Sequence, residues 1–163
     1  QRPSIQSVKM FKKLLTNRVV GISSSGGHLS ELQSAIPDSL LKNITYITSK
    51  DGRTQESLKG LNHLFIVEPN GVKWKYGYNF IQTFFLFLIM RPSVVISTGS
   101  GIVVPYLLFS KFFGSKIIFI ESGARIYSAP RTGKFMNRYA DKFFVQYESL
   151  LKYYPDATVG SLE

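Results

Sequence analysis

The segment 19–32 (VVGISSSGGHLSEL) places the strongest constraint on the fold, because an apolar strand passes through small residues directly into a helix. The residues from Ser24 to Gly27 have minimal side chains, so their backbone N–H groups can approach a ligand, and the helix adds the positive end of its dipole. This arrangement suits a phosphate, a diphosphate or another anion, although a tight turn can also use glycine for its geometry alone. The spacing is neither G-x-G-x-x-G nor G-x-x-x-x-G-K-[ST], so the residues that define dinucleotide and P-loop sites are missing.

Apolar stretches alternate with helical stretches along the rest of the chain. We expect strands at 18–23, 44–48, 63–67, 93–97, 116–120, 142–146 and 157–159, and helices at 29–35, 54–60, 74–90, 103–113, 133–140 and 148–153. This order predicts the α/β class, with a Rossmann-like parallel sheet covered by helices on both faces. Ligands of such sheets bind beyond the carboxyl ends of the strands. We therefore expect the loops at 24–28, 98–101 and 121–125 to converge on one cleft.

The net charge of the chain limits the classes of partner that it can bind. A net charge of +10 over 163 residues implies an anionic partner such as nucleic acid, an acidic membrane surface or a phosphorylated substrate. Nucleic acid is not expected, because the charges do not form a stripe with stacking aromatics. Cysteine is absent, which excludes a disulfide framework or a thiolate metal site. We expect one domain over 18–163, preceded at 1–17 by a basic amphipathic segment that either docks on a membrane surface or is foreign to the native protein.

The expected helix at 74–90 is unusually aromatic. A helix that is apolar on all sides is either buried or in contact with lipid or another protein. Its run of eleven nearly apolar residues (80–90) is shorter than the ~20 residues that cross a bilayer, so the helix is expected to lie on a membrane without spanning it. Burial in the core is the alternative. The residues expected to contact the membrane are Trp74, Tyr76, Tyr78, Phe80, Phe84, Phe85 and Phe87.

Three motifs carry a family resemblance. They are SSSGGHLSEL at 23–32, STGSGIVVP at 97–105 and IESGAR at 120–125, followed by TGK at 132–134 and ADKFFVQ at 140–146. Together they resemble the membrane-associated subunit of the bipartite UDP-N-acetylglucosamine transferase of dolichol-linked oligosaccharide assembly. They are more similar still to the bacterial PssD-type subunits of capsule and exopolysaccharide synthesis. The resemblance covers about residues 18–160.

The resemblance implies the N-terminal half of a GT-B glycosyltransferase, related to the peptidoglycan transferase MurG. The donor-binding C-terminal half would be a separate, PssE-like polypeptide, and the pair would transfer a sugar from a UDP-sugar to a polyprenyl-diphosphate-linked saccharide with inversion. It implies a peripheral location at an anionic membrane surface, on the cytoplasmic face of the bacterial plasma membrane. Neither a metal nor a cofactor is expected, since the partner would hold most of the UDP-sugar. The alternative is a non-catalytic anchor that recruits and activates a catalytic partner.

An inverting transfer needs a base for the acceptor hydroxyl and donors for diphosphate oxygens. The candidate catalytic residues are His28, because histidine titrates near neutral pH, and Glu121, as a base or a ligand of the acceptor hydroxyl. Each also has a structural alternative, namely satisfying the loop for His28 and a salt bridge to Arg125 for Glu121. The candidate substrate-binding residues are Ser25, Gly26, Gly27, Thr98, Gly99, Ser100, Gly101, Ser122, Arg125, Arg131 and Lys134.

Overall fold

The computed structural model describes residues 18–124 and 126–160, and within them seven parallel strands form one sheet. The order across the sheet is β3-β2-β1-β4-β5-β6-β7, which confirms the predicted parallel α/β fold. The strands are β1 (Val19–Ser23), β2 (Thr45–Ser49), β3 (Asn62–Ile66), β4 (Val94–Gly99), β5 (Lys116–Ile120), β6 (Lys142–Val145) and β7 (Thr158–Val159). The order reverses between β1 and β4, where Ser23 pairs with Gly99. Ligands of open α/β sheets bind at such a switch point.

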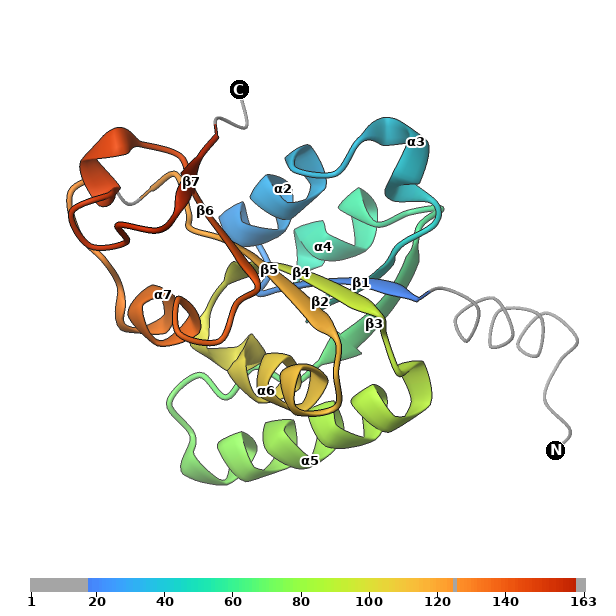
Figure 1. The fold of residues 1–163 in the computed structure, drawn as a ribbon. Coiled ribbons are helices and arrows are strands. Elements are labelled where there is room, and N and C mark those ends of the chain that lie inside the picture. Colours follow the sequence, from blue (N-terminus) through green and yellow to red (C-terminus); the bar gives the residue numbers. More distant parts are fainter. Residues whose placement is uncertain (1–17, 125, 161–163) are drawn as a thin grey trace, which may run out of the picture.

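Helices cover both faces of the sheet (Figure 1). One face carries α2 (Gly27–Ser34), α3 (Asp38–Leu41) and α4 (Gly52–Ser57), and the other carries α5 (Lys73–Met90) and α6 (Val104–Phe112). The short α7 (Arg131–Met136) follows β5, and the 3₁₀ turns are η1 (Gly101–Val103) and η2 (Glu148–Leu150). The sequence did not predict α3, and the helix expected at 148–153 is only the turn η2. The segment 1–17 lies outside the described residues.

The two faces have separate cores. Leu29 and Leu32 of α2 pack with Tyr46 and Leu58 on one face. A larger cluster on the other face joins α5 and α6 to the sheet through residues such as Phe87, Tyr106 and Leu107. Because both faces are covered, the strands can be apolar along their whole length, as the sequence indicated.

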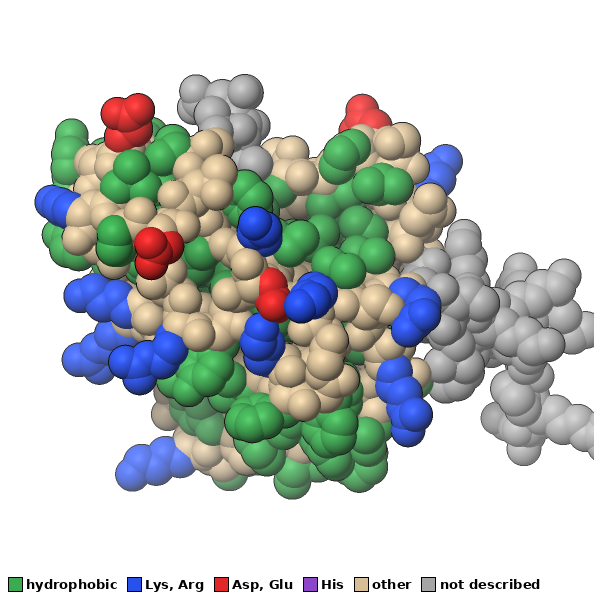
Figure 2. All heavy atoms as spheres, in the orientation of Figure 1, with side chains coloured by type: hydrophobic (Ala, Val, Ile, Leu, Met, Phe, Trp, Pro, Cys, Tyr) green, Lys and Arg blue, Asp and Glu red, His purple; other side chains and the backbone are tan. Residues whose placement is uncertain are grey.

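The protein-facing side of the long helix α5 is polar near its middle and apolar toward its carboxyl end, whereas its exposed side is largely aromatic. Asn79 and Thr83 are buried, whereas Trp74 is 67% exposed, and Tyr76, Tyr78, Phe80, Ile81 and Phe85 are each at least half exposed. Figure 2 shows hydrophobic side chains gathered at the bottom of the molecule, where α5 and α6 lie. Within the described chain, no helix has the length and hydropathy required to cross a bilayer.

The buried polar side of α5 satisfies the backbone at the end of the edge strand β3. The Gln82 amide accepts a hydrogen bond from the Val67 N–H (2.8 Å) and donates one to the Phe65 carbonyl (3.2 Å), as a neighbouring strand would. The Asn79 amide donates to the Val67 carbonyl (2.9 Å). These bonds account for polar residues on the inner side of the helix, since buried backbone groups need partners.

Phe87 is the one residue of the expected membrane-contact set that is buried. It is 4% exposed, because it belongs to the core between α5 and α6, so its assignment to a contact surface was wrong. Phe84 is half-buried against Phe109, with ring centroids 5.1 Å apart. The expectation of a helix apolar on every side was also wrong, because Asn79, Gln82 and Thr83 share the protein-facing side.

Candidate functional site: a cleft at the switch point

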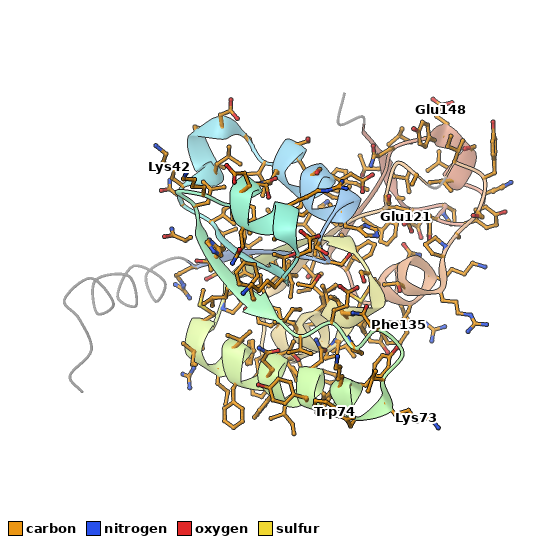
Figure 3. The ribbon with its side chains drawn as sticks, turned by 180° about the vertical axis from the view of Figure 1, so that it is seen from behind. Lys42, Lys73, Trp74, Glu121, Phe135 and Glu148 are labelled. Carbon is orange, nitrogen blue, oxygen red and sulfur yellow. The ribbon has the colours of Figure 1, made fainter. Side chains whose placement is uncertain are left out.

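A cleft of about 390 Å³ opens beyond the carboxyl ends of β4 and β5. Its lining combines the first turn of α2, the loops after β4 and β5, and the start of α7. The lining residues are His28, Thr98, Gly99, Ser100, Phe119, Glu121, Ser122, Ala124, Pro130, Thr132 and Gly133. Figure 3 shows Glu121 at this end of the sheet. The predicted meeting of loops therefore holds for the loops after β4 and β5 and, within the loop 24–28, for His28.

His28 joins α2 to the end of β4 by two hydrogen bonds. Its Nδ1 lies 2.9 Å from the Thr98 carbonyl oxygen, and the Thr98 hydroxyl donates to the His28 carbonyl oxygen (2.6 Å). A carbonyl oxygen can only accept, so Nδ1 carries the proton, and Nε2 of the neutral ring keeps its lone pair. No described residue hydrogen-bonds to Nε2, and the half-buried ring lines the cleft. One nitrogen thus holds the loop, and the other is able to accept a proton.

Glu31, one helical turn after His28, ties α2 to the loop after β5. One carboxylate oxygen accepts hydrogen bonds from the Ser122 hydroxyl (3.0 Å) and the Gly123 N–H (2.8 Å). The other oxygen is buried without a hydrogen-bond partner among the described residues and lies 3.9 Å from Nδ1 of His28. Glu31 therefore places a negative charge beside the imidazole ring and fixes the loop that forms the facing wall.

Glu121 is held in place at the end of β5. Its side chain is 3% exposed, and its two oxygens accept hydrogen bonds from the Tyr154 hydroxyl (2.8 Å) and the Ser122 N–H (3.1 Å). Burial and the carboxylate of Glu121 together raise the pKa of Tyr154, so the phenol stays a hydrogen-bond donor. A carboxylate with both oxygens engaged is better placed to orient a hydroxyl than to remove its proton.

Gly133 of α7 provides the space that Glu121 occupies. A Cβ atom at this position would overlap with a Glu121 carboxylate oxygen and the Tyr154 hydroxyl. Gly123 likewise leaves room for Gln146, whose amide donates to the Glu121 carbonyl oxygen (3.2 Å). The close approach of α7 to the end of β5 thus depends on glycine.

Backbone strain adjoins the cleft. Gly99 has φ +103°, and the next residue, Ser100, has φ +83°, a conformation that non-glycine residues rarely adopt. Such residues cost about 1–3 kcal/mol and concentrate at ligand sites. The Ser97 hydroxyl accepts the Gly99 N–H (3.1 Å) and so helps to hold this turn.

Several predicted substrate-binding residues lie elsewhere. Gly26 and Gly27 line a separate hollow of about 190 Å³ with Arg53, because the turn into α2 directs them toward α4; their expected place in the shared cleft was wrong. The Ser25 N–H donates to the Ser49 hydroxyl (3.0 Å), so this group already has a partner. Gly101, Arg131 and Lys134 are absent from the cleft lining, and Arg125 lies outside the described residues. Lys134 instead lies 5.6 Å from the Tyr153 ring centroid.

Sequence reasoning missed four residues that shape this cleft: Glu31, Gly133, Gln146 and Tyr154. Glu31 offered a local signal, since it follows His28 by three positions and shares its side of the helix. Tyr154 offered none, because it reaches Glu121 from 33 residues away in the sequence.

Comparisons with known proteins identify the family. Residues 73–162 match the family described as "Oligosaccharide biosynthesis protein Alg14 like". The chain is also 32% identical to the UDP-N-acetylglucosamine transferase subunit ALG14 of Candida albicans, over 91% of this chain and 79% of that protein. The chain belongs to the Alg14-like family. The particular closeness to PssD-type subunits stays a prediction.

Solved structures share the fold of this Alg14-like chain. MurG of Acinetobacter baumannii superposes with a TM-score of 0.64 at 16% identity, over 80% of this chain and 42% of MurG. The UDP-GlcNAc 2-epimerase of Methanocaldococcus jannaschii has a TM-score of 0.61 at 17% identity, over 84% of this chain and 41% of the enzyme. The chain thus spans about two fifths of these structures. The likeness shows a GT-B-like, Rossmann fold.

Proposed function

We propose that this chain is the acceptor-side subunit of a two-component inverting glycosyltransferase, active only with a donor-binding partner. The pair would transfer a sugar from a UDP-sugar to a polyprenyl-diphosphate-linked saccharide. Support for a partner comes from the Candida albicans relative, which is named a subunit of a UDP-N-acetylglucosamine transferase. UDP-N-acetylglucosamine is therefore the first donor to test.

The observation that carries the proposal is the tautomer of His28. The Thr98 carbonyl holds the proton on Nδ1, so Nε2 of a ring that lines the cleft keeps its lone pair and would serve as the base. As the acceptor hydroxyl attacks the anomeric carbon and the bond to UDP breaks, Nε2 would take the hydroxyl proton. The nearby Glu31 carboxylate would stabilise the imidazolium that forms.

Glu121 and the loop after β4 would orient the acceptor. The Glu121 carboxylate borders the cleft at a fixed position, where it can accept a hydrogen bond from a second sugar hydroxyl. Thr98, Gly99, Ser100 and Ser122 supply further polar groups along the same wall. Arg131 and Lys134, exposed on α7, add positive charge near the opening and remain our candidates for diphosphate binding. No cofactor is assigned a role in this reaction.

The outer side of α5 is the proposed membrane contact. It carries exposed aromatic residues along its length, with Trp74 and Lys73 at its amino end (Figure 3). Tryptophan and tyrosine favour the headgroup level of a bilayer, and lysine favours anionic lipid. We propose a peripheral location on the cytoplasmic face of a bacterial plasma membrane, a PssE-like partner, and a role in capsule or exopolysaccharide synthesis.

Reconstitution tests the proposal. The chain would be co-purified with its donor-binding partner and assayed with each UDP-sugar in turn on a polyprenyl-diphosphate sugar. We expect transfer by the pair and none by the chain alone. Transfer by the chain alone at the rate of the pair would refute the two-component function. Full transfer by a pair carrying His28→Ala would instead support the anchor-and-activator alternative.

A further inference from the structure

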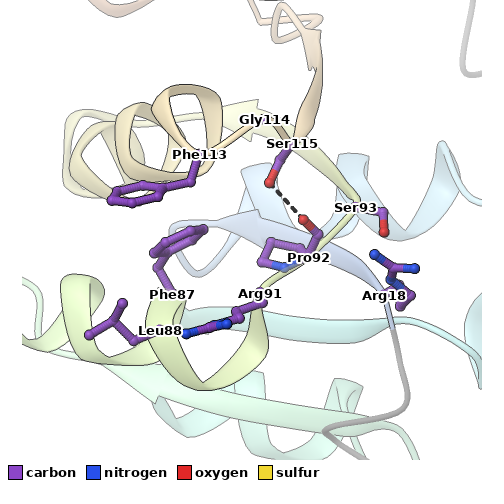
Figure 4. Close-up of a pocket in the computed structure, with 9 residues that line it drawn as sticks. All are labelled: Arg18, Phe87, Leu88, Arg91, Pro92, Ser93, Phe113, Gly114 and Ser115. Carbon is purple, nitrogen blue, oxygen red and sulfur yellow. Dashed lines mark hydrogen bonds between the residues drawn. The ribbon is translucent and has the colours of Figure 1, made fainter.

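A second pocket, of about 440 Å³, opens at the amino ends of the strands, whereas the cleft lies at their carboxyl ends. It is formed where α5 and α6 end and where the chain enters β1, β4 and β5 (Figure 4). None of the candidate catalytic or substrate-binding residues lines it. The proposed transfer reaction therefore does not account for this pocket, and its ligand has to be inferred from its own lining.

The polar lining of this pocket is cationic. Arg18 and Arg91 flank Pro92 at the opening, and no acidic residue lines the pocket (Figure 4). Within the described chain neither arginine forms a salt bridge, whereas Lys111 and Lys116 both pair with Asp141. Two exposed guanidinium groups thus remain without a counter-charge.

Carbonyl groups at the helix ends do not cancel this charge. The ends of α5 and α6 present the negative ends of their dipoles, which by themselves disfavour an anion. One carbonyl at each end already accepts a hydrogen bond: Phe87 O from Arg91 N (2.8 Å), and Ser110 O from Ser115 N (2.9 Å). The Pro92 carbonyl accepts one from the Ser115 hydroxyl (2.6 Å). The two full positive charges also exceed the partial charge of about −0.5 at each of the two helix ends.

The opposite wall of the pocket is apolar and continues onto the molecular surface. Phe87 and Phe113 lie with their ring centroids 5.1 Å apart, and Leu88 borders them. Phe113 is 67% exposed and its neighbour Phe112 is 81% exposed, next to the outer side of α5. A ligand here would meet the Arg91 guanidinium beside Leu88 and the Arg18 guanidinium on the other side of Pro92 (Figure 4).

Arg91, which lines this pocket, has a left-handed backbone conformation. It ends α5 with φ +39°, where glycine would fit without strain. A non-glycine residue in this conformation costs about 1–2 kcal/mol. The Arg91 side chain gives the pocket one of its two cations at that cost.

We propose that this pocket binds the phosphodiester headgroup of an anionic phospholipid, with Arg18 and Arg91 on the phosphate oxygens. Phe112 and Phe113 would enter the acyl-chain region beside the aromatic side of α5. The inference rests on the membrane attachment proposed above and adds a specific lipid site at the far end of α5. The cleft and this site would then lie at the two ends of one membrane-facing helix.

Vesicle flotation of the full chain tests the site. Vesicles of phosphatidylcholine alone would be compared with vesicles that also contain phosphatidylglycerol, at physiological salt. We expect preference for phosphatidylglycerol, and we expect Arg18→Gln with Arg91→Gln to weaken that binding about tenfold. Arg18→Lys with Arg91→Lys should lose most of the preference too, because lysine keeps the charge but not the bidentate geometry.

Lys42→Gln with Lys59→Gln is the matched control, since both lysines are exposed and neither lines the pocket. Lys42 follows α3 (Figure 3), and Lys59 follows α4 in the chain. This pair should change binding by less than about twofold. If the control lost as much vesicle binding as the arginine-to-glutamine variant, or if Arg18→Lys with Arg91→Lys bound like the native chain, the attraction would be non-specific and electrostatic. Either result would overturn the site. Inorganic phosphate that competes as well as short-chain phosphatidylglycerol would overturn the lipid source.

The two proposals fail in different ways. A complex that binds vesicles through the arginines but transfers no sugar would contradict the glycosyltransferase function alone. A complex that transfers sugar to a water-soluble acceptor but shows no headgroup preference would contradict only the lipid site.

Discussion

The charged groups at the carboxyl ends of the strands (the carboxyl edge of the sheet) have different partners from those at the amino ends (the amino edge). At the carboxyl edge, Glu31 and Glu121 each accept two hydrogen bonds of 2.8–3.1 Å. At the amino edge, Asp141 pairs with two lysines, whereas Arg18 and Arg91 form no salt bridge with a described residue. The first edge fixes geometry, as a reacting group requires, and the second offers charge to something outside the chain.

This contrast makes His28 the most sensitive position. His28→Ala removes the base, so we expect kcat of the assembled pair to fall about 10²- to 10⁴-fold. His63→Ala is the matched control, since His63 lies on the edge strand β3 and, among the described residues, its side chain hydrogen-bonds only to the nearby Leu61 carbonyl oxygen. Its activity should stay within about twofold of native. Equal losses in the two variants would mean that His28 acts through the fold.

Gly133→Ala tests whether the carboxyl edge depends on close packing. The new methyl group would push the Glu121 carboxylate away from Tyr154, so we expect a loss of about 1–3 kcal/mol in the free energy of unfolding and a fall in transfer of about tenfold. Urea unfolding followed by circular dichroism measures the first effect.

Gly77→Ala provides the control for that substitution. Gly77 lies inside α5, and a Cβ atom there would meet nothing within 4 Å. Alanine should leave stability unchanged or raise it by about 0.5–1 kcal/mol. A Gly133 variant as stable as this control would show that α7 can move away at no cost.

Glu31 is expected to act by positioning. Glu31→Ala leaves the Ser122 hydroxyl and the Gly123 N–H without their acceptor, so we expect a loss of about 1–2 kcal/mol in stability and several-fold in kcat. Glu31→Gln keeps an acceptor oxygen and should recover most of the stability but not all of kcat, because it lacks the charge beside His28. Equal kcat for Glu31→Gln and the native chain would remove that charge from the mechanism.

The sequence was sufficient for the framework of the fold. Each strand has a short apolar run bounded by turn residues, so all seven could be predicted, together with the edge that carries the cleft. The helix α3 was missed because four residues after Pro37 are too few to show a helical period. The position of His28 and Glu121 at the cleft could be predicted, because Glu121 directly follows β5 and His28 follows the loop after β1.

The remaining features depend on contacts between distant segments. Polar residues lie on the inner side of α5 because the backbone groups at the end of β3 require hydrogen-bond partners. The sequence of 74–90 alone does not show that requirement. The partner of Glu121 comes from Tyr154, and the space for it from Gly133. That Arg18 and Arg91 line one pocket without an acidic residue likewise follows only from the folded arrangement of α5, α6 and the strands.

Asp141 gives the smallest expected effect and tests the compensated part of the amino edge. Burial raises the pKa of Asp141, but the Ile117 N–H (2.8 Å) and the ammonium groups of Lys111 and Lys116 outweigh it and lower the pKa from 3.8 to about 2. A carboxyl group with a lower pKa in the folded state stabilises the fold fully above the unfolded value. That stabilisation is lost as the pH falls from about 4 toward 2.

Asp141→Asn should therefore lower the free energy of unfolding at neutral pH by about 1 kcal/mol, because the side chain is partly exposed and its ion pairs are screened. The difference from the native chain should shrink in unfolding curves recorded as the pH approaches 2. Asp156→Asn, at an exposed site, should show no such trend. If Asp141→Asn also altered the preference for anionic vesicles, Lys111 and Lys116 would belong to the lipid site. The lysines paired with Asp141 would then contribute to lipid binding together with Arg18 and Arg91.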